Sequence, residues 1–562
     1  MLHDPNQEGF MPSRNTIRYL NRLINGIKCD IQKKLTTICL FIDFEKAFDS
    51  IWKAGLIVKL HDIGIRGNIL KLINDFLVNR KVTININGVV GKIKQTSEVG
   101  LPQGSALSPI LFRIYLLDFL TDLENNENIS LYKFADDGTV KVSGQSTERC
   151  LETMNLVLNS IENWVRKNRM LVNCQPDKTE VICFSTAENN KLLVPNSFKL
   201  CGKNIQLVKH TKALGVIIDE DLSFIEHGQS VYKKLVKKWG IICNYCHRHW
   251  GFSHQVMTQI IRTLFLSTLF YAGFLWINEK SIQEIKKLFY KILKSTTGAV
   301  FNTRSSLIEI ILGIPPISIL NSVNETKHYL KLMLNVTPAD KLKDFLTTEL
   351  QTEENSVYHH PVRQTMKFLL WKSIHYPDSI SDTDKLKIQS KDVKEFTNLN
   401  PSSCKYTKPI MTKYIEQMWS KSIQNEYQLE GHSIIPNPSA KPLPIAKGIP
   451  RNIEVMALSL FYDNNLLNGF LYRYNPVMFS SPLCACTREE QTAYHLLFRC
   501  PLVNHQLRSR AYENLQLVVG KELATIESSV ILVNASRNQA FMNNVIDIIK
   551  SIQHTLRSDI IL

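Results

Sequence analysis

The sequence predicts a mixed α+β fold, because stretches with strand and helix patterns alternate in the first third of the chain. Residues 38–42 (ICLFI) form an apolar run with the length of a buried strand. Residues 129–142 (ISLYKFADDGTVKV) place two β-rich runs on either side of an Asp-Gly turn signal, which is typical of a β-hairpin. Residues 148–168 carry apolar side chains at helical spacing. With 44% hydrophobic residues, the chain can build a core between such elements.

Three acidic residues fall where predicted strands end. Asp43 directly follows the buried strand, and Asp136 and Asp137 lie at the tip of the hairpin. Neighbouring carboxylates repel one another and burial makes them harder to charge, so a divalent cation would relieve the conflict. If all three converge, their oxygens suit two hard metal ions of the kind that promote phosphoryl transfer. For the hairpin alone, a solvated Asp-Asp-Gly turn is the alternative.

Four sequence blocks resemble the reverse transcriptases of non-LTR retrotransposons, and most of all the jockey-like insect elements. In chain order they are FIDFEKAFD (41–49), LPQGSALSP (101–109), FADD (134–137), and LVN followed by Lys-Thr (171–179). Each block alone is a weak signal, whereas the ordered set at similar spacings is specific. The resemblance extends over roughly residues 7–320, more than half of the chain.

The resemblance implies catalytic roles for four residues. Asp43, Asp136 and Asp137 would hold two Mg²⁺ ions. Lys178 would protonate the departing pyrophosphate, a task that a positioned lysine can perform. A solvated lysine on a strand edge is the alternative for that position.

Substrate contacts are implied for two further segments. Phe48 matches the bulky residue that excludes a ribose 2′-hydroxyl, and a core aromatic is its alternative. Gln103 and Gly104 match the loop that contacts the incoming nucleotide or the template, where glycine permits close approach of the backbone. Without the other blocks, Pro-Gln-Gly would indicate only a loop.

The implied activity is RNA-directed DNA polymerisation, in which deoxynucleotides are added to a primer 3′-hydroxyl. The implied partners are an RNA template, a DNA primer, dNTPs and the element RNA as a ribonucleoprotein. Relatives carry a larger fingers region, and usually an endonuclease, before the point where this sequence starts. A truncated, inactive retroelement remnant that only binds nucleic acid is therefore the alternative. A cellular RNA-dependent RNA polymerase is a third possibility, which Phe48 argues against.

The charge distribution also favours a polyanionic partner. The net charge is +16, from 67 Lys/Arg and 51 Asp/Glu. Residues 228–300 hold 11 Lys/Arg against two Glu, so more than half of the excess lies there. Within this stretch, a predicted helix carries Lys233, Lys234, Lys237 and Lys238, which suit sequence-independent contacts with a phosphate backbone. A solvated helix face is the usual meaning of such a run.

The cysteines indicate an intracellular protein. The 12 cysteines are scattered, several lie in apolar runs, and no signal peptide is evident at the N-terminus. We therefore expect reduced thiols and a location in the nucleus, the cytoplasm or both. Residues 260–277 approach a membrane span in length, but Arg262 and several Ser/Thr favour a buried core helix and no membrane association.

Two Cys/His groups are candidates for metal binding. Cys484, Cys486, His495 and Cys500 fall within 17 residues and resemble the Cys/His tail of related retroelements, so they predict a zinc-knuckle-like site for Zn²⁺. A reduced-thiol loop beside a buried histidine is the alternative. The segment 243–249 (CNYCHRH) is disfavoured as a metal site, because adjacent side chains on a helix point in different directions.

The predicted organisation is a right-hand polymerase with partial fingers. We expect the partial fingers at 1–37, a palm with an inserted fingers hairpin at 38–204, and a thumb at 205–319. A helical connection with a proline-rich boundary at 434–450 would occupy 320–480, and the Cys/His tail 481–562.

Overall fold

The computed structural model divides the chain into two compact units. It describes residues 4–552 except 79, 96, 185–197, 248, 301, 336–359, 390–398, 400, 430–434, 463–466, 478–480 and 526–527. Unit 1 is formed by the described residues up to His227, and unit 2 by those from Gly228 onward. The first residue of the predicted proline-rich boundary, 434, lies outside the described residues.

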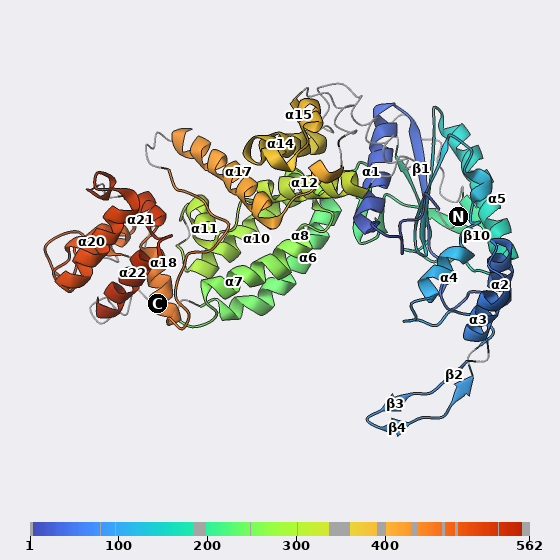
Figure 1. The fold of residues 1–562 in the computed structure, drawn as a ribbon, viewed down its shortest axis with the longest axis horizontal. Coiled ribbons are helices and arrows are strands. Elements are labelled where there is room, and N and C mark those ends of the chain that lie inside the picture. Colours follow the sequence, from blue (N-terminus) through green and yellow to red (C-terminus); the bar gives the residue numbers. More distant parts are fainter. Residues whose placement is uncertain are drawn as a thin grey trace. The chain divides into compact units, whose positions relative to one another are not determined.

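A six-stranded sheet forms the centre of unit 1 (Figure 1). Its strand order is β6-β7-β1-β8-β10-β9, and only the β8–β10 pair is parallel. The strands are β1 (Thr36–Ile42), β6 (Ile129–Phe134), β7 (Asp137–Gly144), β8 (Glu180–Phe184), β9 (Phe198–Leu200) and β10 (Lys203–Leu207). All seven residues of β1 are buried, as the apolar run predicted for a strand in the middle of a sheet.

Helices cover both faces of this sheet. Apolar side chains of β1 at alternate positions, such as Ile38 and Leu40, share a core with α2 (Lys53–Asp62), α4 (Ser108–Tyr115) and α5 (Thr147–Lys167). On the opposite face α1 (Thr16–Gln32) packs against β1 and β6 (Figure 1). The predicted amphipathic helix at 148–168 is thus confirmed within a residue at each end.

A separate antiparallel arm extends from unit 1 after α3 (Gly67–Leu77). It consists of β2 (Lys81–Val82), β3 (Asn85–Ile86), β4 (Val89–Val90) and β5 (Lys94–Gln95). Asn87 and Gly88 form the turn between β3 and β4, with both residues at positive φ, as is typical of a tight hairpin turn. Two short strands, β11 (His210–Ala213) and β12 (Val216–Asp219), form another hairpin near the end of the unit.

Unit 2 is helical in the part that the structure describes. Its first long helix, α6 (Ile225–Ile242), begins in unit 1, and an Asn278 capping box starts α10 (Glu279–Thr297). The other α-helices are α7 (His254–Ile260), α8 (Ser267–Leu269), α9 (Gly273–Trp276), α11 (Ser305–Leu312), α12 (Ile317–Asn335), α14 (His360–His375), α15 (Asp382–Gln389), α17 (Lys408–Leu429), α18 (Arg451–Ser459), α19 (Asn468–Tyr474), α20 (His505–Val519), α21 (Ser529–Ala535) and α22 (Gln539–Ile552).

The apolar segment at 260–277 is several short helical pieces instead of one helix. A π-helical turn at Ile261–Leu266 links α7 to α8, and α9 follows after Ala272, which has a φ of 51°. Across the described residues, no single helix has the length and apolarity needed to cross a membrane. Only the bent pair Ser305–Leu312 and Ile317–Lys331 meets that test, with an angle of 51° between its members.

Candidate active site

Strand register brings the three predicted acids to one edge of the sheet. Ile42 of β1 pairs with Gly138 of β7, and Phe134 of β6 pairs with Asp137. Asp43 is therefore the residue that faces Asp137 across the strand pair. Opposed residues of antiparallel strands have Cα atoms about 5 Å apart. Asp136 lies in the turn of the same hairpin, after Ala135, which adopts a φ of 55°. The convergence of the first acid with the other two is thus a direct result of the register.

The carboxylates influence one another electrostatically. The pKa of Asp137 is raised to about 6, first because surrounding atoms exclude water from the carboxylate and then because Asp136 and Asp43 repel its charge. Lys178 acts in the opposite direction. The surface of Asp137 is nevertheless open to solvent at the hairpin end. The side chain is therefore both accessible and crowded by negative charge, as expected for a cation ligand.

Asp43 has three polar neighbours, all of them from the segment that precedes β8. Asn173 Nδ2 donates to Asp43 Oδ2 at 3.1 Å, and the Asp43 backbone N–H donates to Thr179 Oγ1 at 3.2 Å. Lys178 Nζ lies 3.6 Å from Asp43 Oδ2. This arrangement places the predicted general acid beside the first acidic residue. It also turns the Asp43 carboxylate toward positive and donor groups.

The three carboxylates do not yet form one close ligand set. Among described His, Cys, Asp and Glu side chains, the group whose ligand atoms all lie within 4.8 Å of one another is the Cys/His tail cluster. Like charges keep carboxylates apart, and Asp43 is engaged by Asn173 and Lys178.

The 101–104 loop is attached to the chain that follows Asp43. Leu101 N–H donates to Phe48 O and Gly100 N–H to Ile51 O, each at 2.8 Å. Gln103 Nε2 donates to Asp49 Oδ1 at 3.0 Å, so Asp49 acts as a structural hydrogen-bond acceptor. Gly104 is exposed and has a φ of +85°, which favours glycine. The loop and the acids therefore belong to one connected region.

Phe48 is held by aromatic contacts. Its ring stacks on Phe112 with centroids 4.4 Å apart and 11° between the planes, and it meets Phe10 edge-on at 6.2 Å. The side chain is half-buried and lies in a turn, not at the start of a helix. Fixed aromatic packing is compatible with either proposed role, because a steric gate must be rigid and a core residue also packs in this way.

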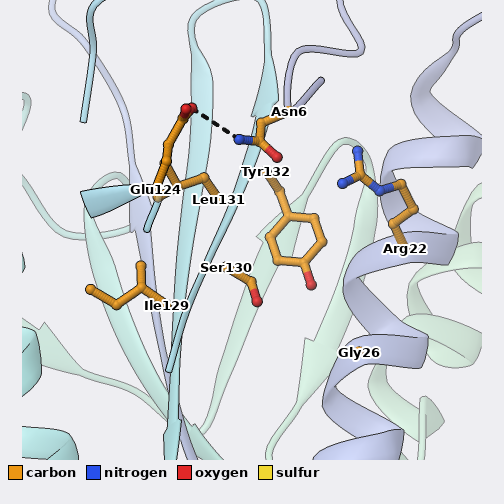
Figure 2. A pocket seen from close by; sticks show the side chains of 8 residues that line it. All are labelled: Asn6, Arg22, Gly26, Glu124, Ile129, Ser130, Leu131 and Tyr132. Carbon is orange, nitrogen blue, oxygen red and sulfur yellow. Dashed lines mark hydrogen bonds between the residues drawn. The ribbon is translucent and has the colours of Figure 1, made fainter. Parts of the chain in front are cut away.

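A pocket beside the edge strand β6 is distinct from the acidic edge. Figure 2 shows its lining, in which Asn6 donates to Glu124. The lining residues are Asn6, Arg22, Gly26, Glu124, Ile129, Ser130, Leu131 and Tyr132. Its volume of about 160 Å³ is below the several hundred Å³ of sites for drug-sized ligands. Asp43, Asp136 and Asp137 do not line this pocket. The candidate active site is therefore the solvent-exposed edge of the sheet where these three acids meet.

Comparison with known proteins agrees with this geometry. Residues 1–218 match the family described as reverse transcriptase (RNA-dependent DNA polymerase). The RNA-directed DNA polymerases from mobile element jockey of Drosophila funebris and Drosophila melanogaster are 25% and 24% identical over 321 and 315 residues. The resemblance to non-LTR retrotransposon reverse transcriptases is confirmed. Each match spans 55% of this chain and 34% of the relative, so the chain spans about a third of the length of these relatives.

Comparison with solved structures gives no further support for the fold. The apo telomerase from Candida tropicalis truncated from its C-terminal domain is 15% identical, with 38% of this chain and 39% of that chain covered. The TM-score is 0.28, too low to support a conclusion. The mixed α/β fold of the reverse transcriptase region therefore rests on its own sheet and helices and on the family match.

The lysine-rich helix lies after the reverse transcriptase match, in α6. Lys233, Lys234 and Lys237 are exposed, whereas Lys238 is half-buried. Lys238 Nζ contacts Thr268 Oγ1 at 2.5 Å and Leu264 O at 3.3 Å. Three of the four lysines thus present their charge to solvent, whereas the half-buried Lys238 makes hydrogen bonds within the protein.

The Cys/His tail of this retroelement-like chain forms a compact cluster. The ligand atoms of Cys484, Cys486, His495 and Cys500 all lie within 4.8 Å of one another. Cys484 Sγ and Cys500 Sγ are 3.6 Å apart, and Cys486 Sγ is 3.3 Å from His495 Nε2. This is the donor set that tetrahedral zinc prefers. The predicted grouping of the four side chains is confirmed, although the ion itself is not shown.

Electrostatics within the cluster differ between its thiols. Burial raises the pKa of Cys484 to about 12 and also raises the pKa of Cys500. For Cys486, partial desolvation raises the pKa, but the backbone N–H of Arg488 and other donors outweigh it and lower the pKa to about 7. A metal ion would favour the thiolate form of all three residues, since zinc binds deprotonated sulfur.

The disfavoured cysteine pair at 243–249 does not form a metal cluster. The buried Cys246 Sγ contacts Met257 Sδ at 3.6 Å, whereas Cys243 Sγ contacts Gly240 O at 3.4 Å. Within the described residues these two thiols belong to no close ligand group. The local structure differs from the predicted helix, because Cys243–Tyr245 form a short 3₁₀ turn.

Sequence reasoning did not identify two orienting residues. Asn173 lies in a block that was noted only for its resemblance, although an amide three residues before a predicted turn is a natural partner for a nearby carboxylate. Glu489 Oε2 lies 3.0 Å from His495 Nδ1, so it orients the imidazole with Nε2 toward the thiols. An acid between two metal-ligand candidates could have suggested that role.

Proposed function

We propose that this chain is an RNA-directed DNA polymerase that extends a primer 3′-hydroxyl on an RNA template. The observation that carries the proposal is the register of β1 against β7, which brings Asp43 beside the Asp136–Asp137 hairpin. The reverse transcriptase match and the names of the jockey relatives support the reaction. The proposal includes dNTPs as substrates and an RNA–primer duplex as partner.

Asp43, Asp136 and Asp137 would hold two Mg²⁺ ions in this proposal. Burial and then the repulsion from Asp136 and Asp43 raise the pKa of Asp137, and a divalent cation would offset that repulsion, so the donor set fits divalent cations. When bound, the ions would lower the pKa of the primer hydroxyl and stabilise charge on the phosphates. Asn173 orients the Asp43 carboxylate through its 3.1 Å hydrogen bond.

Lys178 is proposed to donate a proton to the departing pyrophosphate. Its ammonium is half-exposed and lies 3.6 Å from Asp43 Oδ2, so it can approach a phosphate bound at the acidic edge. Phe48 would limit the space beside the sugar, and Gln103 with Gly104 would contact the nucleotide or the template. The hydrogen bonds that tie the 101–104 loop to residues 48–51 support this placement.

We assign the finer parts of the fold by the same proposal. Unit 1 would provide the palm and the hairpin of the fingers, and the helices from α6 onward the thumb and connection. Lys233, Lys234 and Lys237 would contact the phosphate backbone, since they are exposed on one helix. The Cys/His cluster would bind one structural Zn²⁺ and support contacts with RNA.

Primer extension tests the reaction directly. The full chain is incubated with poly(rA)/oligo(dT), dTTP and Mg²⁺, and product length is measured on a gel. We expect extension that requires Mg²⁺ and is much slower with UTP than with dTTP. Binding of the primer–template without extension would identify a nucleic-acid-binding remnant and contradict the polymerase proposal. Preferential use of UTP would indicate an RNA polymerase instead.

A further inference from the structure

The loop between α6 and α7 displays two stacked aromatic pairs at the surface. Tyr245 and Phe252 have ring centroids 5.0 Å apart with 21° between their planes. His247 and Trp250 have centroids 4.7 Å apart with 11° between their planes. We call the described residues 245–247 and 249–252 the aromatic loop. Trp250 is 54% exposed although His247 covers one face of its ring, so the exposed area includes the remaining face and edges.

Backbone interactions fix the shape of the aromatic loop. Cys246 and Gly251 form an antiparallel bridge, and Phe252 N–H donates to Tyr245 O at 2.9 Å. Gly251 has a φ of +121°, and a Cβ there would come within 2.1 Å of Tyr245 O. Arg451 Nε of α18 donates to His247 O at 3.2 Å. The aromatic rings are therefore held in position before any partner binds, which reduces the entropy lost on binding.

The surroundings of the loop are positively charged in sequence. Residues 228–254 contain five Lys/Arg and no Asp or Glu. The exposed Lys233, Lys234 and Lys237 lie on α6, the helix that leads into the loop. Lysines followed by exposed flat rings combine phosphate attraction with stacking surfaces, the two features of single-strand binding sites.

We propose that the aromatic loop is a stacking platform for an unpaired base of the nucleic acid whose phosphates contact the α6 lysines. An unpaired base adds to the His247–Trp250 stack on the exposed face of Trp250, because parallel or offset rings attract through their faces. The inference rests on the proposed function and adds to it a site for single-stranded RNA or DNA next to the duplex-binding helix.

Binding to two labelled oligonucleotides tests this site in the full chain. One is a single-stranded RNA, and the other has the same length and charge but lacks bases in its central part. Fluorescence anisotropy gives the affinity of each for wild type and Trp250→Ala. We expect Trp250→Ala to weaken binding of the intact strand roughly 5- to 100-fold, the range for loss of one base–aromatic stack. On the abasic strand the variant and wild type should bind equally.

Three variants separate stacking from charge and from misfolding. Trp250→Phe keeps a ring and should retain most of the affinity. Replacing Lys233, Lys234 and Lys237 by Gln should reduce the salt dependence by a slope of about 2, because each lost phosphate contact on a single strand removes about 0.7. Leu429→Ala removes another highly exposed apolar side chain of unit 2 and should bind as wild type.

The outcomes separate this site from the proposed polymerase activity. Equal binding of the intact strand by wild type and Trp250→Ala would overturn the stacking platform, even if wild type extends primers. An equal loss on intact and abasic strands would also overturn it, since that loss would not depend on a base. Unchanged RNA binding together with lost binding to phosphatidylserine vesicles would assign the loop to membranes. If wild type fails to extend primers but shows the base-dependent loss, the platform stands without the polymerase.

Discussion

The acidic edge of the sheet and the Cys/His tail are built in opposite ways. At the acidic edge, Asp43 and Asp137 are 94 positions apart in sequence and meet only through the pairing of β1 with β7. In the tail, the four ligand candidates from Cys484 to Cys500 span 17 residues and come together by local turns. The first cluster therefore depends on the fold of unit 1, whereas the second depends on a short loop.

The two clusters also differ in how closely their side chains are already arranged for metal binding. The tail ligand atoms already lie within 4.8 Å of one another, and Glu489 orients the histidine. The backbone brings the three acids to one edge of the sheet, but burial and then repulsion by Asp136 and Asp43 raise the pKa of Asp137. The Asp43 carboxylate accepts a hydrogen bond from Asn173 and lies 3.6 Å from Lys178 Nζ. The tail cluster does not bring three carboxylate charges together, so its ligand atoms can approach closely without a metal, while three carboxylates cannot. In the proposed function, the tail would therefore hold a permanent structural ion, and the acidic edge would hold ions that arrive with substrate.

The largest expected effect is on catalysis by the acidic edge. Asp136→Asn removes one charge at nearly constant shape, so we expect primer extension to fall at least about a thousandfold, since metal-based stabilisation of developing charge is worth several kcal/mol. Primer–template binding should be nearly unchanged. Single-turnover extension and anisotropy measure the two quantities. Asp62→Asn, at an exposed position of α2, is the matched control with wild-type activity. Full extension by Asp136→Asn would exclude the acids as the metal site.

A second variant tests the local nature of the tail cluster. Cys500→Ser replaces a fully buried ligand candidate, so we expect purified full chain to lose its zinc, from about one ion per chain to none. Elemental analysis after dialysis measures the ratio. Cys201→Ser changes an exposed thiol of unit 1 and should leave zinc content unchanged. Zinc retained by Cys500→Ser would show that this residue is not a ligand.

Loss of the Glu489 carboxylate should weaken zinc binding less than loss of a ligand candidate such as Cys500. Glu489→Gln keeps the side-chain length but removes the negative charge beside His495 Nδ1, so we expect zinc affinity to fall about 10- to 100-fold. Competition with a chromophoric chelator measures that affinity. The exposed Glu513 is a suitable control on α20. Affinity equal to wild type in Glu489→Gln would mean that the imidazole is held by other contacts.

The smallest expected effect is on the stability of unit 1, through the contact between Gly100 and the backbone of Asp49 near the acidic edge. Gly100 has a φ of +92°, and a Cβ there would meet Asp49 O at 2.9 Å, whereas Gly202, with a φ of +76°, has open space. Both substitutions by alanine add backbone strain, but only Gly100→Ala adds a clash. We expect it to destabilise unit 1 by about 1–2 kcal/mol more than Gly202→Ala. Urea unfolding would compare them, and equal losses would argue against a tightly attached loop.

Local patterns in the sequence were sufficient for the elements that carry the sites. The apolar run before Asp43 and the Asp-Gly signal after Asp136 predicted a buried strand and a hairpin, because burial and turn chemistry are local properties. Resemblance to relatives then indicated which acids meet. The tail spacing likewise predicted a compact cluster. Roles for Phe48, Gln103, Gly104 and Lys178 remain predictions.

Contacts between distant segments could not be predicted from the sequence. The hydrogen bonds from Asn173 to Asp43 and from Gln103 to Asp49 join positions that only the folded sheet brings together. Ser108 is the first residue of α4, and its hydroxyl donates to Pro102 O at 2.6 Å in the loop that precedes the helix.

Binding of Mn²⁺ to the full chain tests the central claim most directly, because this ion reports its bound state in electron paramagnetic resonance spectra. The measurement uses a chain-terminated primer on RNA template with dTTP present. We expect about two bound Mn²⁺ ions in wild type and Asp62→Asn, and a marked loss in Asp43→Asn and in Asp137→Asn alike. Unchanged Mn²⁺ binding in Asp43→Asn would show that the end of β1 and the hairpin do not share the ions.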